Sequence, residues 1–256
     1  MRAWVVLPSF NEAANLPALF SRFQKLAAAA GDLDLHVLVV DDGSTDGTAR
    51  VARDAAGTVP VEVITHDANR GLAETFKRGM IDAASRAKPG DVIVCMDADN
   101  SHMPDQIPSM IGEIHAGRDV VIASRYRPGS IVRGVPWPRR ILSRGLSVLL
   151  SIVLPIEGVR DYSCGYRVYR AEFVQRALTA QGDRLFVNDG FACMLGILLH
   201  LARAGGVFGE IPLVLRYDQK LGTSKMKVGT TITRTLALVT RERLRRRNGG
   251  IFTRLL

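Results

Sequence analysis

Along the first half of the chain, short runs rich in valine, isoleucine and leucine alternate with longer segments of helical periodicity. The runs expected to form strands are residues 3–8, 35–41, 61–65 and 91–97. The segments expected to form helices are residues 12–30, 46–56, 71–88 and 104–116. Such alternation is typical of a mostly parallel sheet whose strands are joined by helices. We therefore predict a doubly wound α/β core.

After residue 120 the alternation becomes less regular. We expect a strand at 120–124, a loop rich in arginine, glycine and proline, a helix at about 139–153 and a strand at 166–169. Helical spacing places two sets of residues on separate faces of that helix: Leu142, Leu146, Leu149 and Val153 on one, and Arg140, Arg144, Ser147 and Ser151 on the other. The apolar face is expected either to pack against the core or to contact a membrane.

Composition places the chain among globular proteins. Its 256 residues, 47% hydrophobic and 23% charged, suit one sizeable domain and exclude the disordered and fibrous classes. We assign residues 1–240 to this single domain and residues 241–256 to a basic tail. The longest apolar stretches, 146–156 and 191–201, are shorter than the ~20 residues of a membrane-spanning helix, so no span is expected.

The amino-terminal residues and the cysteines indicate a cellular compartment. The first residues lack the long apolar segment and small-residue cleavage site of a secretory signal. Cys95, Cys164 and Cys193 are odd in number and have no CxxC spacing, so neither a disulfide framework nor a zinc site is indicated. We expect a cytoplasmic protein that is not exported.

The formal net charge of +9 is concentrated in two places. Residues 125–144 contain six arginines and no acidic residue, and residues 241–254 contain six arginines and one glutamate. Such clusters indicate an anionic partner, although a solvated basic face is the alternative, above all for the tail. Because no nucleic-acid-binding module is visible, we expect this partner to be something other than nucleic acid.

Polar residues follow the predicted strands at the points where the strands end. Asn11 and Glu12 follow the first strand, Asp41 and Asp42 end the second, and Asp97 ends the fourth. Ligands of open α/β sheets bind beyond the carboxyl ends of the strands, so these side chains should meet at one edge. Each of them alone is also explained as a helix cap, but their joint occurrence favours a binding site.

Acidic residues at two of these strand ends are candidates for binding a nucleoside or a metal. Asp41 and Asp42 could hold a nucleoside through its base and ribose, with Asp46 as a helix cap. We expect the side chains of Asp97 and Asp99 to point to opposite sides, with Asp99 binding a metal and Asp97 supporting the sugar or ribose. Paired carboxylates with diphosphate oxygens suit Mg²⁺ or Mn²⁺.

Four segments in this order, PSFNE, DDGSTDGT, NRGL and MDADNSH, resemble inverting glycosyltransferases of family 2. The later segments SRYRPG, RRILSRG, YSCGYRVYR and LGTSKM look like the dolichol-phosphate mannose synthase group within that family. The resemblance covers nearly the whole chain and implies a GT-A fold. The QxxRW pattern of processive synthases is absent, since the tryptophans are Trp4 and Trp137, so we expect a single transfer.

The resemblance implies roles for particular residues. Those implied to line the nucleotide pocket are Pro8, Phe10, Glu12, Asp41, Asn69 and Gly71. Those implied to hold the metal are Asp97, Asp99 and Ser101, and those implied to meet an acceptor phosphate are Arg125, Arg139 and Ser143. Arginine suits the last role, because its planar donors match phosphate oxygens bidentately.

This chain departs from the family pattern at several positions. Ser101 stands where many relatives have glutamine, and Asn100 replaces an apolar residue. Gln219 occupies the place of an arginine that grips the donor diphosphate, so we expect Lys220 or Lys225 to take over that role.

The implied reaction moves mannose from GDP-mannose onto a polyprenyl or dolichyl phosphate. A phosphomonoester is anionic at neutral pH and needs no protein base, whereas a hydroxyl acceptor would need one, with Asp189 as the candidate. Another nucleotide sugar, such as a UDP-sugar, or a hydroxyl acceptor is the alternative. We expect peripheral binding to the cytoplasmic face of an anionic membrane, where a membrane-embedded partner subunit is a further candidate.

Overall fold

The computed structural model describes residues 1–186, 192–222 and 237–240. Its main sheet has seven strands in the order β3-β2-β1-β4-β7-β5-β8. These strands are β1 (Arg2–Ser9), β2 (Asp34–Asp41), β3 (Val61–Thr65), β4 (Val92–Cys95), β5 (Val120–Ser124), β7 (Arg167–Arg170) and β8 (Phe208–Pro212). All neighbouring pairs are parallel except those of β7, which runs antiparallel to β4 and β5. The predicted α/β class with a mostly parallel sheet is confirmed.

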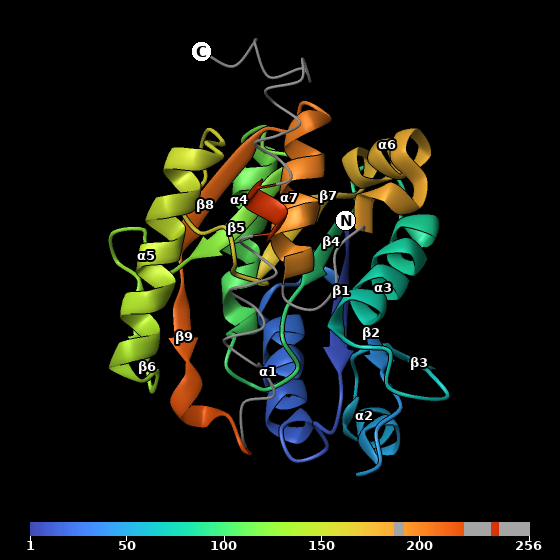
Figure 1. Cartoon of the computed structure of the whole chain (residues 1–256). Helices are drawn as coiled ribbons and strands as arrows, with labels where there is room; N and C mark the ends of the chain where they lie inside the picture. The colour runs from blue at the N-terminus through green and yellow to red at the C-terminus, as the bar shows by residue number, and fades with distance from the viewer. Residues whose placement is uncertain (187–191, 223–236, 241–256) are drawn as a thin grey trace.

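Helices flank the sheet on both sides (Figure 1). They are α1 (Leu16–Ala29), α2 (Thr48–Ala55), α3 (Leu72–Arg86), α4 (Ile107–His115), α5 (Trp137–Val153), α6 (Ala171–Gln181) and α7 (Cys193–Arg203). Short 3₁₀ turns are η1 (Pro104–Gln106), η2 (Gly182–Phe186) and η4 (Tyr217–Gln219). Helix α3 packs against β1, β2 and α6 on one side, and α1 lies on the other. A second sheet pairs β6 (Ile131–Arg133) with β9 (Val214–Arg216).

The buried strands explain why the pattern of the sequence was informative. Every residue of β4 and β5 is buried, as expected for parallel strands covered by helices on both faces. Helix α3 approaches β1 and β2 closely at Gly79, where an added Cβ would lie 2.3 Å from a Val6 methyl group. Packing at this distance requires glycine, and it holds α3 against the strands whose ends carry the polar residues.

Two element boundaries differ from the prediction in ways that matter for the site. Helix α1 begins at Leu16 and not at Glu12, because the Glu12 carbonyl accepts hydrogen bonds from the amides of Asn15 and Leu16 in a turn. Strand β4 ends at Cys95, so Asp97 lies in the following turn. The prediction that Asp97 and Asp99 point to opposite sides is wrong, because both line one cavity. Alternation along a strand would itself place residues two apart on the same face, and neither residue lies in β4.

Candidate active site

A cavity of about 370 Å³ opens at the carboxyl ends of β1, β2 and β4. It brings together most of the residues singled out from the sequence: Pro8, Phe10, Glu12, Asp42, Asn69, Gly71, Asp97, Asp99, Ser101, Arg139 and Lys220. Tyr217, Leu72 and Thr75 also line it and were not predicted. We call this the donor cavity. Asp41, Arg125 and Ser143 lie outside its lining, and Lys225 lies outside the described residues.

The turn after β2 presses against the segment that contains Asn69. Gly43 has φ 70°, and a Cβ there would lie 2.7 Å from the carbonyl carbon of Ala68, so the close approach requires glycine. Asp41 is buried beneath this turn and accepts a hydrogen bond from the Ser44 amide at 3.2 Å. Asp41 therefore supports the turn from below and lies outside the lining of the donor cavity, so its contact with a nucleotide stays a prediction.

Asp42 lines the donor cavity, but its carboxylate is engaged by the protein. It accepts hydrogen bonds from the amides of Arg70 at 2.9 Å and Gly71 at 2.8 Å, and His66 Nδ1 contacts it at 2.8 Å. Burial opposes its ionisation, but these hydrogen bonds outweigh burial and hold the pKa of Asp42 below its usual value. Asp42 thus fixes the turn at Gly71, and its contact with a nucleotide stays a prediction. No spacing signal in the sequence links His66 to Asp42.

The acidic turn after β4 is held by His102. Its Nδ1 accepts a hydrogen bond from the Asp97 amide at 3.1 Å, and its ring stacks on Tyr166 with centroids 5.0 Å apart. Asn100 adopts φ 60°, a left-handed conformation that asparagine tolerates better than the apolar residue of related proteins would. This turn directs both Asp97 and Asp99 into the donor cavity.

Asp99 is paired on both carboxylate oxygens. Ser101 Oγ donates to Oδ1 at 2.6 Å, and Lys220 Nζ donates to Oδ2 at 2.7 Å. Burial alone would raise the pKa of Asp99, but the charge of Lys220 outweighs it and the pKa lies below its usual value. For Lys220, burial acts to lower the pKa, yet the charge of Asp99 raises it above its usual value. Both groups are therefore ionised in this state.

The donor set of the turn fits a magnesium or manganese ion. The carboxylates of Asp97 and Asp99, with the hydroxyl of Ser101, offer only oxygen atoms, which these cations prefer. Within residues 1–186, 192–222 and 237–240, no group of three or more histidine, cysteine, aspartate or glutamate side chains is arranged to hold a metal. The protein alone would thus supply an incomplete coordination shell, which suits a metal that also binds substrate oxygens and water.

A second cavity of about 370 Å³ lies beside the first, and we call it the arginine cavity. Its lining comprises Arg125, Tyr126, Val132, Val135, Trp137, Arg139, Arg140, Ile141, Ser143, Arg144 and Leu215. Arg139 lines both cavities, and its Nη1 donates to the Tyr217 hydroxyl at 3.3 Å. The structure therefore brings Arg125, Arg139 and Ser143 to one cavity, although their contact with an acceptor stays a prediction.

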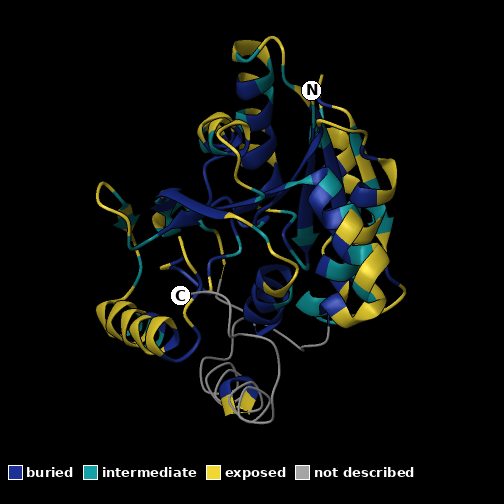
Figure 2. Cartoon of the chain, turned by 90° about the horizontal axis from the view of Figure 1, so that it is seen from above, coloured by how far each residue is buried: buried dark blue, intermediate teal, exposed yellow. Residues whose placement is uncertain are grey.

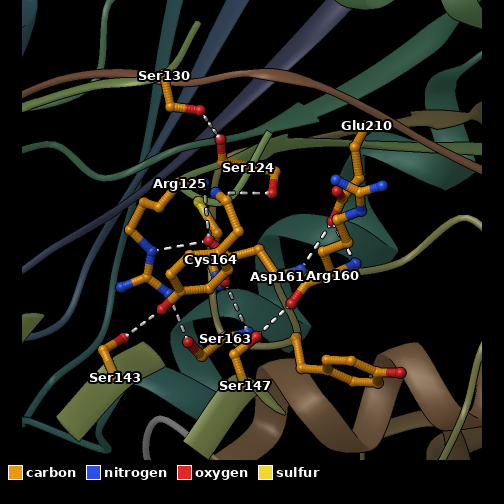
Figure 3. A network of polar contacts seen from close by, with 12 residues as sticks. Ser124, Arg125, Ser130, Ser143, Ser147, Arg160, Asp161, Ser163, Cys164 and Glu210 are labelled. Atoms are coloured by element: carbon orange, nitrogen blue, oxygen red, sulfur yellow. Dashed lines mark hydrogen bonds and ion pairs between the residues drawn. The ribbon is translucent and has the colours of Figure 1, made fainter. Parts of the chain in front are cut away.

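The guanidinium of Arg125 is held by a buried carboxylate (Figure 3). Its Nε and Nη2 each donate to Asp161 at 2.7 Å, and Nη2 also donates to Ser163 Oγ at 2.7 Å. Asp161 is fully buried, and burial acts to raise its pKa, but the charge of Arg125 holds the pKa below its usual value. The arginine loop lacks acidic residues in sequence, yet in space Arg125 has a carboxylate partner that the sequence analysis did not find.

Helix α5 differs from the prediction about its faces. Its buried residues are Ser147 from the predicted polar face, Val153 from the predicted apolar face, and Leu150, whereas Leu142 and Leu149 of the apolar face are exposed. Ser147 is buried because its hydroxyl donates to the Arg160 carbonyl. Apolar residues at helical spacing cover the outer side of α5: Trp137, Ile141, Val148 and Ile152, 53% to 72% exposed. The helix at the left of Figure 2 shows this exposure.

Other predictions concern residues that the structure places differently or does not describe. Gln219 Oε1 accepts a hydrogen bond from Arg22 at 2.6 Å, so its side chain is turned to α1. Asp189 and the tail 241–256 lie outside the described residues. In the described part of the chain, no helix combines the length and apolarity that crossing a bilayer requires.

Comparison with known proteins gives one consistent family. The model of glycosyl transferase family 2 matches residues 4–178. The chain is 32% identical over 227 residues to the polyprenol monophosphomannose synthase of Mycolicibacterium smegmatis, covering 88% of this chain and 81% of the relative. It is 33% identical over 256 residues to the undecaprenyl-phosphate mannosyltransferase of Micrococcus luteus, covering 100% of this chain and 99% of the relative.

A solved structure confirms the fold. The glucosyl-3-phosphoglycerate synthase of Mycobacterium tuberculosis, in complex with Mn²⁺, UDP and phosphoglyceric acid, matches with a TM-score of 0.67 and 21% identity, covering 94% of this chain and 78% of the other. At this identity the likeness concerns the fold alone, and it confirms the predicted GT-A architecture.

Proposed function

Because this chain belongs to glycosyltransferase family 2 and is a glycosyltransferase, we propose that it transfers one mannose from GDP-mannose, with inversion, onto a polyprenyl or dolichyl phosphate. The two relatives described above are named for mannosyl transfer to polyprenol and undecaprenyl phosphate. Identity of about a third over nearly the full length of both supports the same reaction class here.

One observation carries the proposal: Arg139 lies in the wall that the two cavities share. On one side are the oxygen ligands of the acidic turn, suited to a metal and a diphosphate. On the other side are arginines and the Ser143 hydroxyl, suited to a second phosphate. A sugar at the junction would have its leaving group in the donor cavity and its nucleophile in the arginine cavity.

The residues present account for the chemistry without a protein base. A phosphomonoester has a second pKa of about 6, so its oxygen is already nucleophilic at neutral pH. Arg139 and Arg125 would hold this phosphate and orient it toward the anomeric carbon. Holding the two reacting groups in this geometry raises the rate. A Mg²⁺ or Mn²⁺ ion held by Asp97 and Asp99 would neutralise the departing nucleoside diphosphate. The bond to the diphosphate breaks as the bond to the acceptor oxygen forms, and the anomeric centre inverts.

A donor and acceptor screen tests the function. The purified chain is offered GDP-mannose, UDP-glucose or UDP-galactose with Mn²⁺, and each donor is combined with undecaprenyl phosphate, undecaprenol or phosphoglycerate. We expect product with GDP-mannose and the lipid phosphate. Equal transfer to undecaprenol would favour a hydroxyl acceptor and a general base, and transfer from a UDP-sugar alone would overturn the proposed donor.

Replacing Arg139 with alanine should impair acceptor use more than donor binding. Losing one charge-assisted hydrogen bond to phosphate costs about 1.5 to 3 kcal/mol, which is roughly a ten- to hundredfold loss in kcat/KM for the lipid phosphate. Calorimetry with GDP-mannose and Mn²⁺ would report donor affinity separately. Arg176→Ala, an exposed arginine on α6, is the control and should behave like the wild type. Donor affinity that falls as far as acceptor efficiency would place Arg139 in the diphosphate site instead.

The outer side of α5 supports peripheral attachment to the cytoplasmic face of a membrane. Its apolar residues lie beside Arg140 and Arg144 at the mouth of the arginine cavity, where a lipid phosphate would enter. Apolar side chains at the level of the headgroups with basic residues beside them are typical of helices that lie in a membrane interface.

Replacing Val148 and Ile152 together with serine should weaken binding to vesicles of phosphatidylglycerol roughly thirtyfold, since each apolar side chain contributes on the order of 1 kcal/mol on insertion. Co-sedimentation at fixed ionic strength measures the effect. The control carries Ile81→Ser and Val207→Ser, an exposed pair on other elements. Equal binding of the wild type and the α5 variant would show that another surface attaches the enzyme, or that a partner subunit does.

A further inference from the structure

We propose that Lys220 is an exchangeable counter-ion, which occupies the metal position at Asp99 in the metal-free enzyme and moves to the donor diphosphate when a divalent cation replaces it. The inference deepens the proposed function, because it concerns the same donor cavity. It assigns to Lys220 a positioning role that couples metal binding to nucleotide binding.

The first observation is the ion pair itself. Lys220 Nζ lies 2.7 Å from Asp99 Oδ2, with the two side chains only 11% and 10% exposed. The other oxygen, Oδ1, accepts from both the amide and the hydroxyl of Ser101. A magnesium ion binds carboxylate oxygen at about 2.0 to 2.1 Å, so at Oδ2 it would lie within a few ångströms of the ammonium group, and the two cations would repel each other. Binding of a metal at Asp99 therefore favours the departure of Lys220.

The second observation is that the backbone around Lys220 is anchored. The Leu221 amide donates to Asn15 Oδ1 at 2.8 Å, and Asn15 Nδ2 donates to the Leu221 carbonyl at 3.1 Å. On the other side of Lys220, Arg22 donates to Gln219 Oε1 at 2.6 Å. These three hydrogen bonds join the segment to the first two turns of α1 and the residue before it. The ammonium group can therefore leave Asp99 by rotation of its own side chain while the segment stays in place.

The third observation is a destination for the released side chain. Lys220 Nζ lies 5.6 Å from the centre of the Tyr217 ring, and the Arg139 guanidinium lies 5.5 Å from the same ring. Tyr217 thus gathers two cations at the wall of the donor cavity. A diphosphate in this cavity would receive the charge of Lys220 in addition to that of the metal.

The charges of the cavity make the exchange favourable only when a nucleotide is present. Four carboxylates line it, Glu12, Asp42, Asp97 and Asp99, against the two cations Lys220 and Arg139. Without nucleotide, a metal must displace Lys220 and leave its ammonium group near another cation. With a diphosphate bound, both cations have anionic partners. Metal and nucleotide should therefore bind cooperatively, each raising the affinity of the other by the same factor.

Binding of Mn²⁺ to the nucleotide-free protein tests the first half of the proposal, with the paramagnetic resonance signal of free Mn²⁺ as the readout. We expect Lys220→Met to bind Mn²⁺ about tenfold more tightly than the wild type, because two cations within a few ångströms repel each other. Lys25→Met, which removes an exposed lysine of α1, is the control for net charge and should bind Mn²⁺ as the wild type does. Lys220→Arg keeps a competing cation and should also bind like the wild type.

Binding of GDP with saturating Mn²⁺ tests the second half. The proposal expects the opposite sign here: Lys220→Met should bind GDP about tenfold more weakly, since one charge-assisted contact to the diphosphate is gone. Weaker or unchanged Mn²⁺ binding by Lys220→Met would overturn the exchange, and unchanged GDP binding would overturn the move to the diphosphate. If Lys220→Met does not fold, Lys220→Gln, which can still donate a hydrogen bond to Asp99, replaces it with the same expected signs.

The Mn²⁺ titration also separates this inference from the proposed function. It involves neither sugar nor acceptor, so its result holds even if the screen finds another nucleotide sugar or a hydroxyl acceptor. If Lys220→Met does not bind Mn²⁺ more tightly than the wild type, the proposed transfer still stands, and Lys220 forms a fixed structural ion pair with Asp99.

Discussion

Replacing Asp99 with asparagine is expected to reduce sugar transfer by about a hundred- to a thousandfold, the range found when a group that stabilises developing charge is removed. The asparagine side chain keeps the shape of aspartate but has one acceptor oxygen, so it can accept from Ser101 or from Lys220 but not from both, and the negative charge that holds the metal is lost. Initial rates with saturating GDP-mannose and Mn²⁺, together with the midpoint of thermal unfolding, would measure both properties.

Asp105→Asn provides the matched control for this experiment. Asp105 is an exposed carboxylate in η1, a few residues beyond the acidic turn, and it does not line the donor cavity. Its replacement should leave the rate unchanged. If Asp99→Asn retained near-normal, metal-dependent turnover, the acidic turn would not be the metal site.

The largest expected effect on stability comes from Asp161→Asn. This buried carboxylate pairs with Arg125 through two hydrogen bonds, and breaking a buried pair by removing one charge typically costs about 3 to 5 kcal/mol in the free energy of unfolding. Urea unfolding at neutral pH would measure the loss. The double variant Asp161→Leu with Arg125→Met should recover part of it, because neither charge then remains unpaired, while the backbone amides of Arg125 and Cys164 lose their acceptor. A loss below about 1 kcal/mol would be typical of an exposed pair and would contradict this account.

The same ion pair predicts a dependence of stability on pH. The pKa of Asp161 is lower in the folded chain than its ordinary value, so the folded state binds fewer protons at this site than the unfolded state. Its stabilising contribution is complete above the ordinary aspartate pKa of about 4 and is lost as the pH falls through the lower folded-state pKa. The Asp161→Leu, Arg125→Met variant should therefore lose less stability than the wild type between neutral and acidic pH.

Local signals in the sequence predicted the strands and the residues at their ends. The run at 120–124 matches β5 residue for residue, because a buried strand needs nearly continuous apolar side chains. The run at 61–65 matches β3, an edge strand whose residues are half-buried or exposed. Asp42, Asp97 and Asp99 reach one cavity because parallel strands present their carboxyl ends at the same edge. Both predictions need only the spacing of apolar residues along the chain and the order and direction of the strands in the sheet.

Partners that are distant in sequence could not be predicted in this way. His66 meets Asp42 across 24 residues, Asp161 meets Arg125 across 36, and Lys220 meets Asp99 across 121. No periodicity links such pairs. For a related reason the sequence left open whether the apolar face of α5 packs against the core: apolar residues at helical spacing normally face a core, but α5 lies at the margin of the sheet and exposes several of them.

The position of β7 between β4 and β5 sets the distance between the acidic turn and Arg125. The acidic turn follows β4 and Arg125 follows β5, and one strand separates the two. Neighbouring strands lie about 4.8 Å apart, so the two strand ends are held about 10 Å from each other. The bond that breaks and the bond that forms share the anomeric carbon, so this gap has to hold the leaving phosphate, that carbon and the acceptor oxygen in one line. Variants that change which sugar is transferred should therefore arise in side chains around the gap, while the distance between the two strand ends is set by the sheet.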